Sequence, residues 1–211
     1  MYKKARLHFK KHDPRLHAAS LEYEIEDLEQ SDDLFRDIAS TIIGQQLSGK
    51  AADTIFGRFE ALFPGKLILP EEILKLRDEQ LRACGLSGAK ARSIKDLAAK
   101  VISGDVNIER LPLLPDEEVM QELTKVKGIG PWTAEMVLMF SLGRTDVFSM
   151  GDLVLKKGLM SLYGWKKLPS ARTVSKVLNS WSPYRTYAAR ILWKIEDRKK
   201  PGALRKEYEG K

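Results

Sequence analysis

The sequence of 211 residues contains a single cysteine, Cys84, and no long run of apolar residues. One cysteine excludes an internal disulfide, a cysteine-based zinc cluster and a four-cysteine iron–sulfur cluster. No apolar run approaches the roughly 20 residues of a membrane-spanning helix, and the basic N-terminus lacks the apolar stretch of a signal peptide. These absences predict a protein of the reducing cytoplasm, with no membrane partner and no bound metal cluster.

Strand-like alternation of apolar and polar residues is also scarce, and only Tyr2–Phe9 offers a weak case. Apolar stripes at spacings of three and four residues are frequent instead, and most of them end at glycine or proline. These stripes predict helices over residues 34–42, 55–63, 91–102, 116–125, 133–142, 152–163, 170–180 and 183–197. The sequence therefore predicts an all-α protein.

The net charge of +7 is unevenly distributed along the chain. Residues 152–211 carry fifteen Lys and Arg against five acids, whereas residues 1–151 have a small net negative charge. This asymmetry favours a polyanion that binds the C-terminal part. A lysine-rich surface that is merely solvated explains the charge equally well.

Two glycines, Gly128 and Gly130, bracket one apolar residue between two predicted helices. Glycine allows a tight hairpin and a close approach of the backbone to an anion, so that the amides of the turn can face a phosphate. Val126 and Ile129 would then pack between the two helices. A Gly-x-Gly turn alone is weak evidence, because turns of this composition are common.

The sequence contains four motifs in a defined order and spacing. They are Ile43-Gly44-Gln45-Gln46-Leu47-Ser48, Gly128-Ile129-Gly130-Pro131-Trp132-Thr133-Ala134, Asp146-Val147-Phe148-Ser149-Met150-Gly151-Asp152 and Trp181-Ser182-Pro183-Tyr184-Arg185-Thr186-Tyr187-Ala188. These motifs resemble those of the helix–hairpin–helix base-excision DNA glycosylases (the HhH-GPD superfamily), and most of all the 3-methyladenine DNA glycosylase II branch. The resemblance runs from about residue 33 to residue 197.

The resemblance implies the fold of these glycosylases, in which two helical lobes enclose an active-site cleft. We expect one lobe to consist of the chain ends, residues 1–35 and 143–211. The central residues 36–142 would form the other lobe, with the helix–hairpin–helix motif at about 123–136.

The resemblance also implies site residues of four kinds. They are the catalytic carboxylate, Asp152; the rings that stack on an extruded base, Trp132 and Tyr187; the loop that wedges into DNA, Gln45, Gln46 and Leu47, with Gln46 as the wedge; and the phosphate-binding residues, Gly128, Gly130, Lys127, Thr133 and Arg185. As in relatives, carbonyls of the hairpin could hold a monovalent cation, and no other cofactor is expected. Locally, Asp152 also suits a helix N-cap, the two rings also suit a core, and the loop also suits an ordinary helix end.

The chain departs from parts of the family in ways that narrow the expected activity. Relatives that also cut the DNA backbone carry a lysine just after the Gly-x-Gly-x turn, where this chain has Trp132, so the amine nucleophile of that chemistry is missing. The best-known relatives have two adjacent acids where this chain has Gly151 and Asp152. Asp152 is therefore the residue that we align with the catalytic acid.

The function implied is that of a monofunctional DNA glycosylase in base excision repair. We expect a monomer associated with the nucleoid that binds double-stranded DNA, releases alkylated bases such as 3-methyladenine and 7-methylguanine, and leaves an abasic site without lyase activity. The alternative is a non-catalytic helix–hairpin–helix module that binds DNA. Such a module would keep the glycines and the cations but would not need Asp152.

Overall fold

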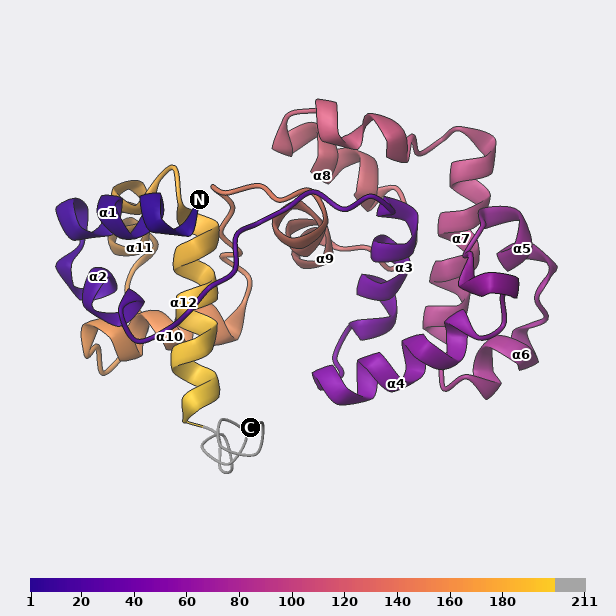
Figure 1. Ribbon diagram of the computed structural model, residues 1–211, viewed down its shortest axis with the longest axis horizontal. Helices are drawn as coiled ribbons and strands as arrows, with labels where there is room; N and C mark the ends of the chain where they lie inside the picture. Colours follow the sequence, from indigo (N-terminus) through magenta and orange to yellow (C-terminus); the bar gives the residue numbers. More distant parts are fainter. Residues whose placement is uncertain (200–211) are drawn as a thin grey trace. The chain divides into compact units, whose positions relative to one another are not determined.

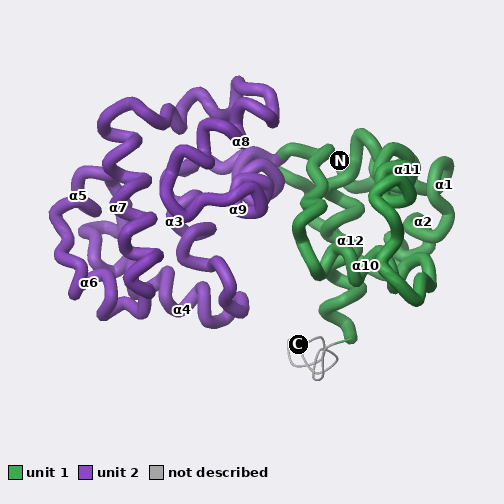
Figure 2. The backbone as a smooth tube through the Cα atoms, turned by 180° about the vertical axis from the view of Figure 1, so that it is seen from behind, with its two compact units in different colours: residues 1–28, 144–211 green, residues 29–143 purple. Residues whose placement is uncertain are grey.

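The computed structural model describes residues 1–199, which form helices and contain no strand, and residues 21–33 make a long connection between the second and third helices (Figure 1). The chain divides into two compact units: residues 1–28 with the residues from 144 onward, and residues 29–143 (Figure 2). Among the described helices, none combines the length and the apolar character needed to cross a membrane. The prediction of an all-α protein is confirmed.

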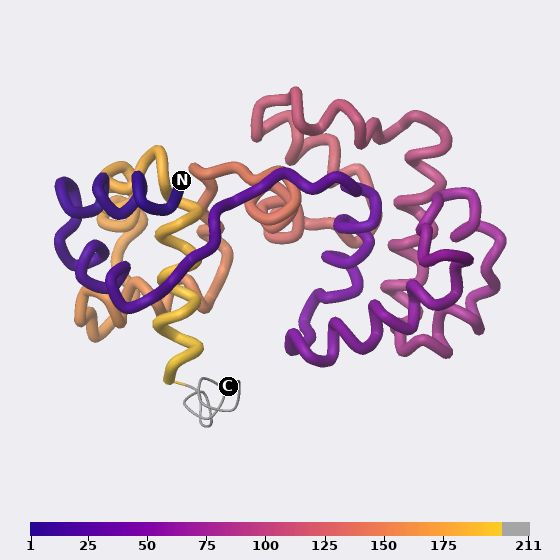
Figure 3. The backbone as a smooth tube through the Cα atoms, viewed as in Figure 1, coloured from indigo at the N-terminus to yellow at the C-terminus, as the bar shows by residue number. Residues whose placement is uncertain are grey.

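The first unit brings together helices from both ends of the chain (Figure 3). Its helices are α1 (Tyr2–His12), α2 (Pro14–Ser20), α10 (Leu153–Tyr163), α11 (Ala171–Trp181) and α12 (Arg185–Arg198). Helix α10 packs along α12, and α1 packs on α2 and α11. Gly158 permits this close packing, because a Cβ atom there would lie 2.8 Å from the Cβ atom of Leu192.

The segment with weak strand character, Tyr2–Phe9, lies within helix α1, so that expectation was wrong. Its buried residues Tyr2, Ala5 and Phe9 recur at spacings of three and four, which places them on one face of a helix. A strand would have alternated them with exposed positions. Tyr2 N–H at the helix start donates to Asp27 Oδ1 at 2.5 Å.

A buried carboxylate, Asp13, ties three helices of the first unit together. Its Oδ1 accepts from Leu16 N–H at 3.0 Å and so caps α2, while its Oδ2 accepts from Trp181 Nε1 at 2.7 Å and from the Tyr163 hydroxyl. Burial, together with the hydrogen bond to Asp13, raises the pKa of Tyr163. The phenol therefore stays a donor, and the end of α10 is fixed against α2 and α11.

The second unit has its core along α3 and α7. Its elements are α3 (Leu34–Gly44), α4 (Gly49–Glu60), η1 (Pro64–Lys66), α5 (Pro70–Lys75), α6 (Asp78–Ala83), α7 (Gly88–Ser103), η2 (Ile108–Leu113), α8 (Asp116–Thr124), α9 (Pro131–Met136) and η3 (Val137–Ser141). Ile38 and Ile42 of α3 and Ile94 and Leu97 of α7 are fully buried. The predicted helix over 133–142 is divided between α9 and the single π-helical turn η3.

Residues 29–35 and Gly143 belong to the second unit, whereas the sequence predicts that they belong with the chain ends. Ser31 N–H donates to Ser141 O at 2.8 Å, and Asp33 Oδ1 accepts from Arg36 N–H at 3.0 Å, which caps α3. These bonds join the segment to α3 and η3. The last residues of the predicted first lobe, 200–211, lie outside the described residues.

Candidate functional site

The hairpin between α8 and α9 forms where the two glycines predict it. Val126 and Ile129 are buried beneath it, and Ile129 N–H donates to Val126 O at 3.0 Å to close the turn. Gly128 has a φ of 85°, a conformation that side-chain-bearing residues rarely adopt. Gly130 precedes α9, and its carbonyl accepts from Ala134 N–H at 3.1 Å.

Two amides of the hairpin have no protein acceptor among residues 1–199: those of Gly128 and Gly130. The amide of Lys127, between α8 and the glycines, donates to Asp96 Oδ2 at 2.7 Å and therefore does not face an anion. The Lys127 side chain is exposed. Neighbouring backbone N–H groups with a cation beside them can hold an anion. Phosphate binding by these residues stays a prediction.

Helix α7 supports the hairpin through residues that the sequence does not single out, Ser93 and Asp96. A Cβ atom at Gly128 would lie 2.2 Å from Ser93 Oγ, so the hairpin backbone packs directly on α7. Asp96 accepts from the Lys127 amide and also from Lys100 Nζ at 3.1 Å. No motif marks either residue. Only the contact between segments about 30 positions apart in the chain reveals their role.

We expect the stability contributed by Asp96 to be lost at low pH. Burial raises the pKa of Asp96, but the hydrogen bonds from the Lys127 amide and from Lys100 outweigh burial and hold this pKa below its ordinary value. A carboxylate with a depressed pKa in the folded state contributes stability above its unfolded pKa, and this stability is lost as the pH falls through the folded pKa.

The measurement is the free energy of unfolding in urea of the wild type and of Asp96→Asn. The wild type should be more stable by about 1–2 kcal/mol above about pH 5, and the difference should shrink as the pH falls below about 4. Asp53→Asn is the control, because Asp53 is exposed on α4. A difference between wild type and Asp96→Asn that is constant over this pH range would contradict the expectation.

The turn between α3 and α4, residues 45–48, is exposed at its tip. Gln46 and Leu47 both contact solvent, and Leu47 is 37% exposed despite its apolar side chain. Gln46 has a φ of 58°, which is uncommon for a residue other than glycine. Backbone strain of this kind concentrates at functional sites. The wedge role of Gln46 and Leu47 stays a prediction.

Gln45 and Thr133 have roles different from those predicted. Gln45 Nε2 donates to Gly128 O at 3.0 Å and to Thr133 Oγ1 at 2.9 Å, so its side chain faces the hairpin and is not available to insert into DNA. Thr133 is buried, and its hydroxyl accepts this bond instead of facing a phosphate. Both residues join the turn to the hairpin.

The two predicted stacking rings lie in different environments. Trp132 is 40% exposed in the first turn of α9, so its ring is accessible, and its role in base stacking stays a prediction. Tyr187 is fully buried in the first unit, where it stacks on Tyr2 with ring centroids 5.7 Å apart. Its hydroxyl accepts from Leu28 N–H at 3.2 Å. The stacking role predicted for Tyr187 was wrong, because a ring packed on all sides cannot contact a base.

Asp152 lies in the first unit at the start of α10 and is almost completely buried. Its Oδ1 accepts from Val154 N–H at 2.7 Å and from Leu155 N–H at 2.9 Å. The N-cap role that the local sequence suggests is therefore present, and it fixes the direction of the carboxylate. The buried Ser149 hydroxyl, close before it in the chain, has no hydrogen-bond partner among the described residues. Such orphaned groups are rare in folded proteins. The catalytic role of Asp152 stays a prediction.

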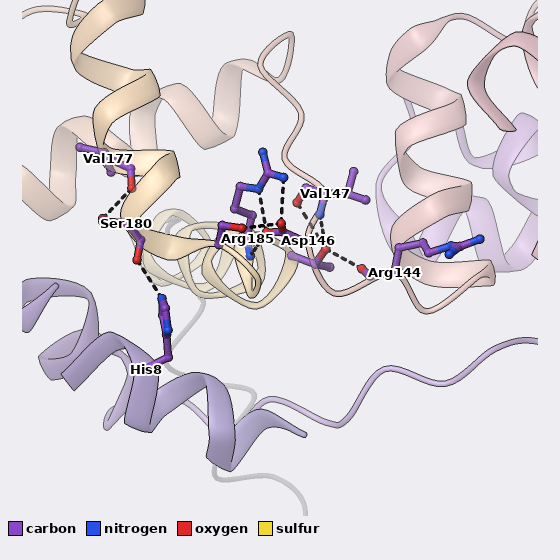
Figure 4. A network of polar contacts seen from close by, with 9 residues as sticks. His8, Arg144, Asp146, Val147, Val177, Ser180 and Arg185 are labelled. Carbon is purple, nitrogen blue, oxygen red and sulfur yellow. Dashed lines mark hydrogen bonds and ion pairs between the residues drawn. The ribbon is translucent and has the colours of Figure 1, made fainter. Parts of the chain in front are cut away.

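Arg185, predicted to bind phosphate, is paired with Asp146 at the start of α12 (Figure 4). Arg185 Nε lies 2.7 Å from Asp146 Oδ1 and Nη2 lies 2.9 Å from Oδ2, while Ser182 Oγ donates to Oδ2 at 2.7 Å. Burial raises the pKa of Asp146, but these hydrogen bonds hold it below its ordinary value. The ion pair anchors α12 to the segment that leads to Asp152. A phosphate contact by Arg185 stays a prediction.

Comparisons with known proteins show the family of this chain. The sequence model of the HhH-GPD superfamily of base excision DNA repair proteins matches residues 39–183. DNA-3-methyladenine glycosylase 1 of Schizosaccharomyces pombe is 41% identical over 172 residues, which cover 81% of this chain and 74% of that protein.

Two solved structures are similar to most of this chain. The 3-methyladenine DNA glycosylase of Schizosaccharomyces pombe in complex with abasic DNA has a TM-score of 0.81 and 36% identity, with 92% of this chain and 97% of that chain covered. The DNA-3-methyladenine glycosidase of Bacillus halodurans has a TM-score of 0.76 and 37% identity, with 95% and 90% covered. The chain therefore belongs to the HhH-GPD superfamily of base excision DNA repair proteins.

Proposed function

We propose that this protein is a monofunctional DNA glycosylase, active as a monomer, that releases alkylated bases of the 3-methyladenine and 7-methylguanine type from double-stranded DNA and leaves an abasic site. The observation that carries the proposal is the nearly buried Asp152 carboxylate, oriented by two amides. The names of the similar proteins, 3-methyladenine glycosylases, support the substrate class.

The proposed task of Asp152 follows from the charge that develops in the reaction. When the N-glycosidic bond breaks, positive charge builds on the deoxyribose, and a preorganised carboxylate stabilises that charge. At about 4 Å and an effective dielectric constant near 20, a pair of unit charges interacts by about 4 kcal/mol. The amides of Val154 and Leu155 keep the carboxylate in place, so that little reorganisation is needed during the reaction.

Alkylated purines suit catalysis by a single carboxylate, because they are already cationic and are good leaving groups. The enzyme therefore needs little acid catalysis and can select the lesion through an electron-rich ring. Trp132 is accessible for this purpose. Stacking of a cationic base on its indole would contribute roughly 0.5–2 kcal/mol.

The second unit would hold the DNA while the base is extruded. Extrusion costs a few kcal/mol, and less for a damaged base. Gln46 and Leu47 would fill the gap, and the amides of Gly128 and Gly130 would hold a phosphate. A monovalent cation at the hairpin would share the carbonyls of Val126 and Gly128, each of which accepts one protein hydrogen bond and keeps a second lone pair.

We expect base release without strand cleavage. Duplex DNA carrying a single 7-methylguanine is incubated with the protein and resolved on a denaturing gel, with and without heating in alkali. Strand breaks should appear only after the alkali step, because Trp132 stands where an amine nucleophile would be needed for lyase chemistry.

An undamaged duplex of the same sequence is the control for contaminating nucleases. Strand breaks before alkali treatment would contradict the monofunctional assignment. If no alkylated base is released although the duplex is bound, the alternative of a non-catalytic helix–hairpin–helix module is correct instead.

A further inference from the structure

We propose that Gln45 and Lys90 are positioning residues that bind the exposed turn 45–48 to the hairpin. They would keep the wedge residue Gln46 at a fixed distance from the phosphate-binding amides of the hairpin. This inference rests on the proposed function, since it assigns the two residues a task in extruding the base. Neither residue contacts the reacting atoms in this proposal. Their task is to hold the two DNA-contacting segments of the second unit in place.

The turn 45–48 has few local bonds that could hold it in place. Gln46 adopts a positive φ, and the N-cap residue Ser48 makes no side-chain capping bond to α4. Within the turn, Leu47 N–H donates to Gly44 O at 3.1 Å. An exposed turn with a strained residue needs support from outside to keep one conformation.

Lys90 supplies this support from α7. Its ammonium donates to the carbonyls of Ile43 and Gln45, both at 2.7 Å, and so binds the C-terminal end of α3 where the turn begins. A cation is favoured at this end of a helix, since the last carbonyls have no intrahelical partner. Ser87 caps α7 by accepting from Lys90 N–H at 3.3 Å, which fixes the helical turn that carries the lysine. Burial lowers the pKa of Lys90, as expected for an ammonium partly withdrawn from water.

Gln45 extends this support to the hairpin, 83 positions further along the chain. Its Nε2 group donates to Gly128 O and to Thr133 Oγ1, which lie on the two sides of Gly130. A backbone carbonyl can only accept, so the contact with Gly128 fixes which end of the Gln45 amide carries the donors. The side chain is therefore a link between the wedge turn and the phosphate-binding hairpin.

Helix α7 completes the connection. Lys90 binds the turn, while Ser93 packs against Gly128 and Asp96 binds the Lys127 amide. These three residues follow one another at intervals of three, so they lie along one side of α7. The turn and the hairpin are thus each bound to α7 and also bound to each other through Gln45. A shift of either segment breaks bonds of the other, and displacements of about 1 Å can cost about 100-fold in rate.

The first test removes the donors of Gln45 with almost no change of shape. Gln45→Glu places a carboxylate oxygen against the Gly128 carbonyl, and we expect the single-turnover rate of 7-methylguanine release to fall by about 10- to 100-fold. Gln80→Glu is the matched control, because Gln80 Oε1 accepts from Arg77 N–H at 2.9 Å, a bond that glutamate can also accept. Wild-type rates for Gln45→Glu, or equal losses in both variants, would overturn the proposal.

The second test does not depend on catalysis. Among the described residues, the Lys90 ammonium donates to the carbonyls of Ile43 and Gln45 and not to the hairpin. Because Gln45 joins the turn to the hairpin, Lys90→Met should nevertheless raise amide hydrogen exchange in the peptide covering residues 127–134 by about tenfold. Lys90→Arg should restore protection. The control is Lys95→Met on the same helix as Lys90, which loses an ion pair with Asp78 of α6 and should leave exchange in this peptide unchanged.

The two tests separate failure of this inference from failure of the proposed function. If the wild type releases no alkylated base, the function is wrong, but the exchange measurement still decides whether the turn and the hairpin are coupled. If the wild type is active and exchange in residues 127–134 is the same in Lys90→Met and in the wild type, the positioning role is wrong while the function stands.

Discussion

Asp152→Asn should abolish most base release while leaving DNA binding and folding intact. The loss of the negative charge removes a stabilisation of about 4 kcal/mol from the charged transition state, which corresponds to a fall of roughly 10³-fold in the single-turnover rate on 7-methylguanine DNA. Asparagine caps helices about as well as aspartate. The asparagine side-chain oxygen can therefore accept the hydrogen bonds from the amides of Val154 and Leu155 that Asp152 Oδ1 accepts in the wild type.

A second substitution distinguishes the effect of the Asp152 charge on catalysis from the effect of its N-cap hydrogen bonds on stability. Asp152→Ala removes both, so it should lose the same activity and also about 1 kcal/mol of stability. Thermal unfolding and binding to a duplex with an abasic-site analogue are measured beside the rates. If Asp152→Asn releases base at a rate close to that of the wild type, Asp152 is only an N-cap and the catalytic assignment fails.

Gly128→Ala should displace the hairpin and weaken binding to duplex DNA strongly. The φ of 85° disfavours any side chain, and the added Cβ atom would lie 2.2 Å from Ser93 Oγ and 3.1 Å from Ser93 Cβ. The strained conformation alone costs about 1–2 kcal/mol, and the overlap with α7 adds to it. We expect a loss of about 2–3 kcal/mol in unfolding free energy and at least a roughly tenfold loss in affinity for DNA, measured by urea unfolding and fluorescence anisotropy.

Gly130→Ala is the matched control for this prediction. Gly130 has a φ of −97°, and a Cβ atom there would meet nothing within 4 Å. Its free energy of unfolding should therefore stay within about 0.5 kcal/mol of the wild-type value. If both substitutions reduce stability equally, the contact with Ser93 and the positive φ do not explain why position 128 requires glycine.

The longer helices were predicted from local sequence, although α4 begins six residues before its predicted start, and the short helices α2 and α5 were not predicted. Apolar stripes at helical spacing, ended by glycine or proline, gave the all-α fold, and the two glycines gave the hairpin between α8 and α9. The first helix was missed because its stripe, Tyr2, Ala5 and Phe9, is short enough to be confused with strand alternation. Burial of these three residues against the rest of the first unit favours a helix over a strand.

The roles of individual site residues were less predictable, because a side chain's role depends on partners far away in the chain. Gln45 was expected at the DNA, but the acceptors that bind it are on the hairpin. Tyr187 was expected in a pocket for the base, yet Tyr2 from the other end of the chain covers it. Lys90 and Asp96 carry no local signal, and only their distances to the turn and to the hairpin identify them.

The sequence by itself determined the class of fold, the position of the hairpin and the family, because helical periodicity, glycine turns and motif spacing are properties of neighbouring residues. The tertiary structure decided which side chains remain exposed at the hairpin and the turn. It also decided which side chains form the hydrogen bonds that hold these two segments in place. A hydrogen bond between segments that are 83 positions apart, such as that from Gln45 to Gly128, exists only after the chain has folded. Its energy depends on a distance that no local pattern encodes.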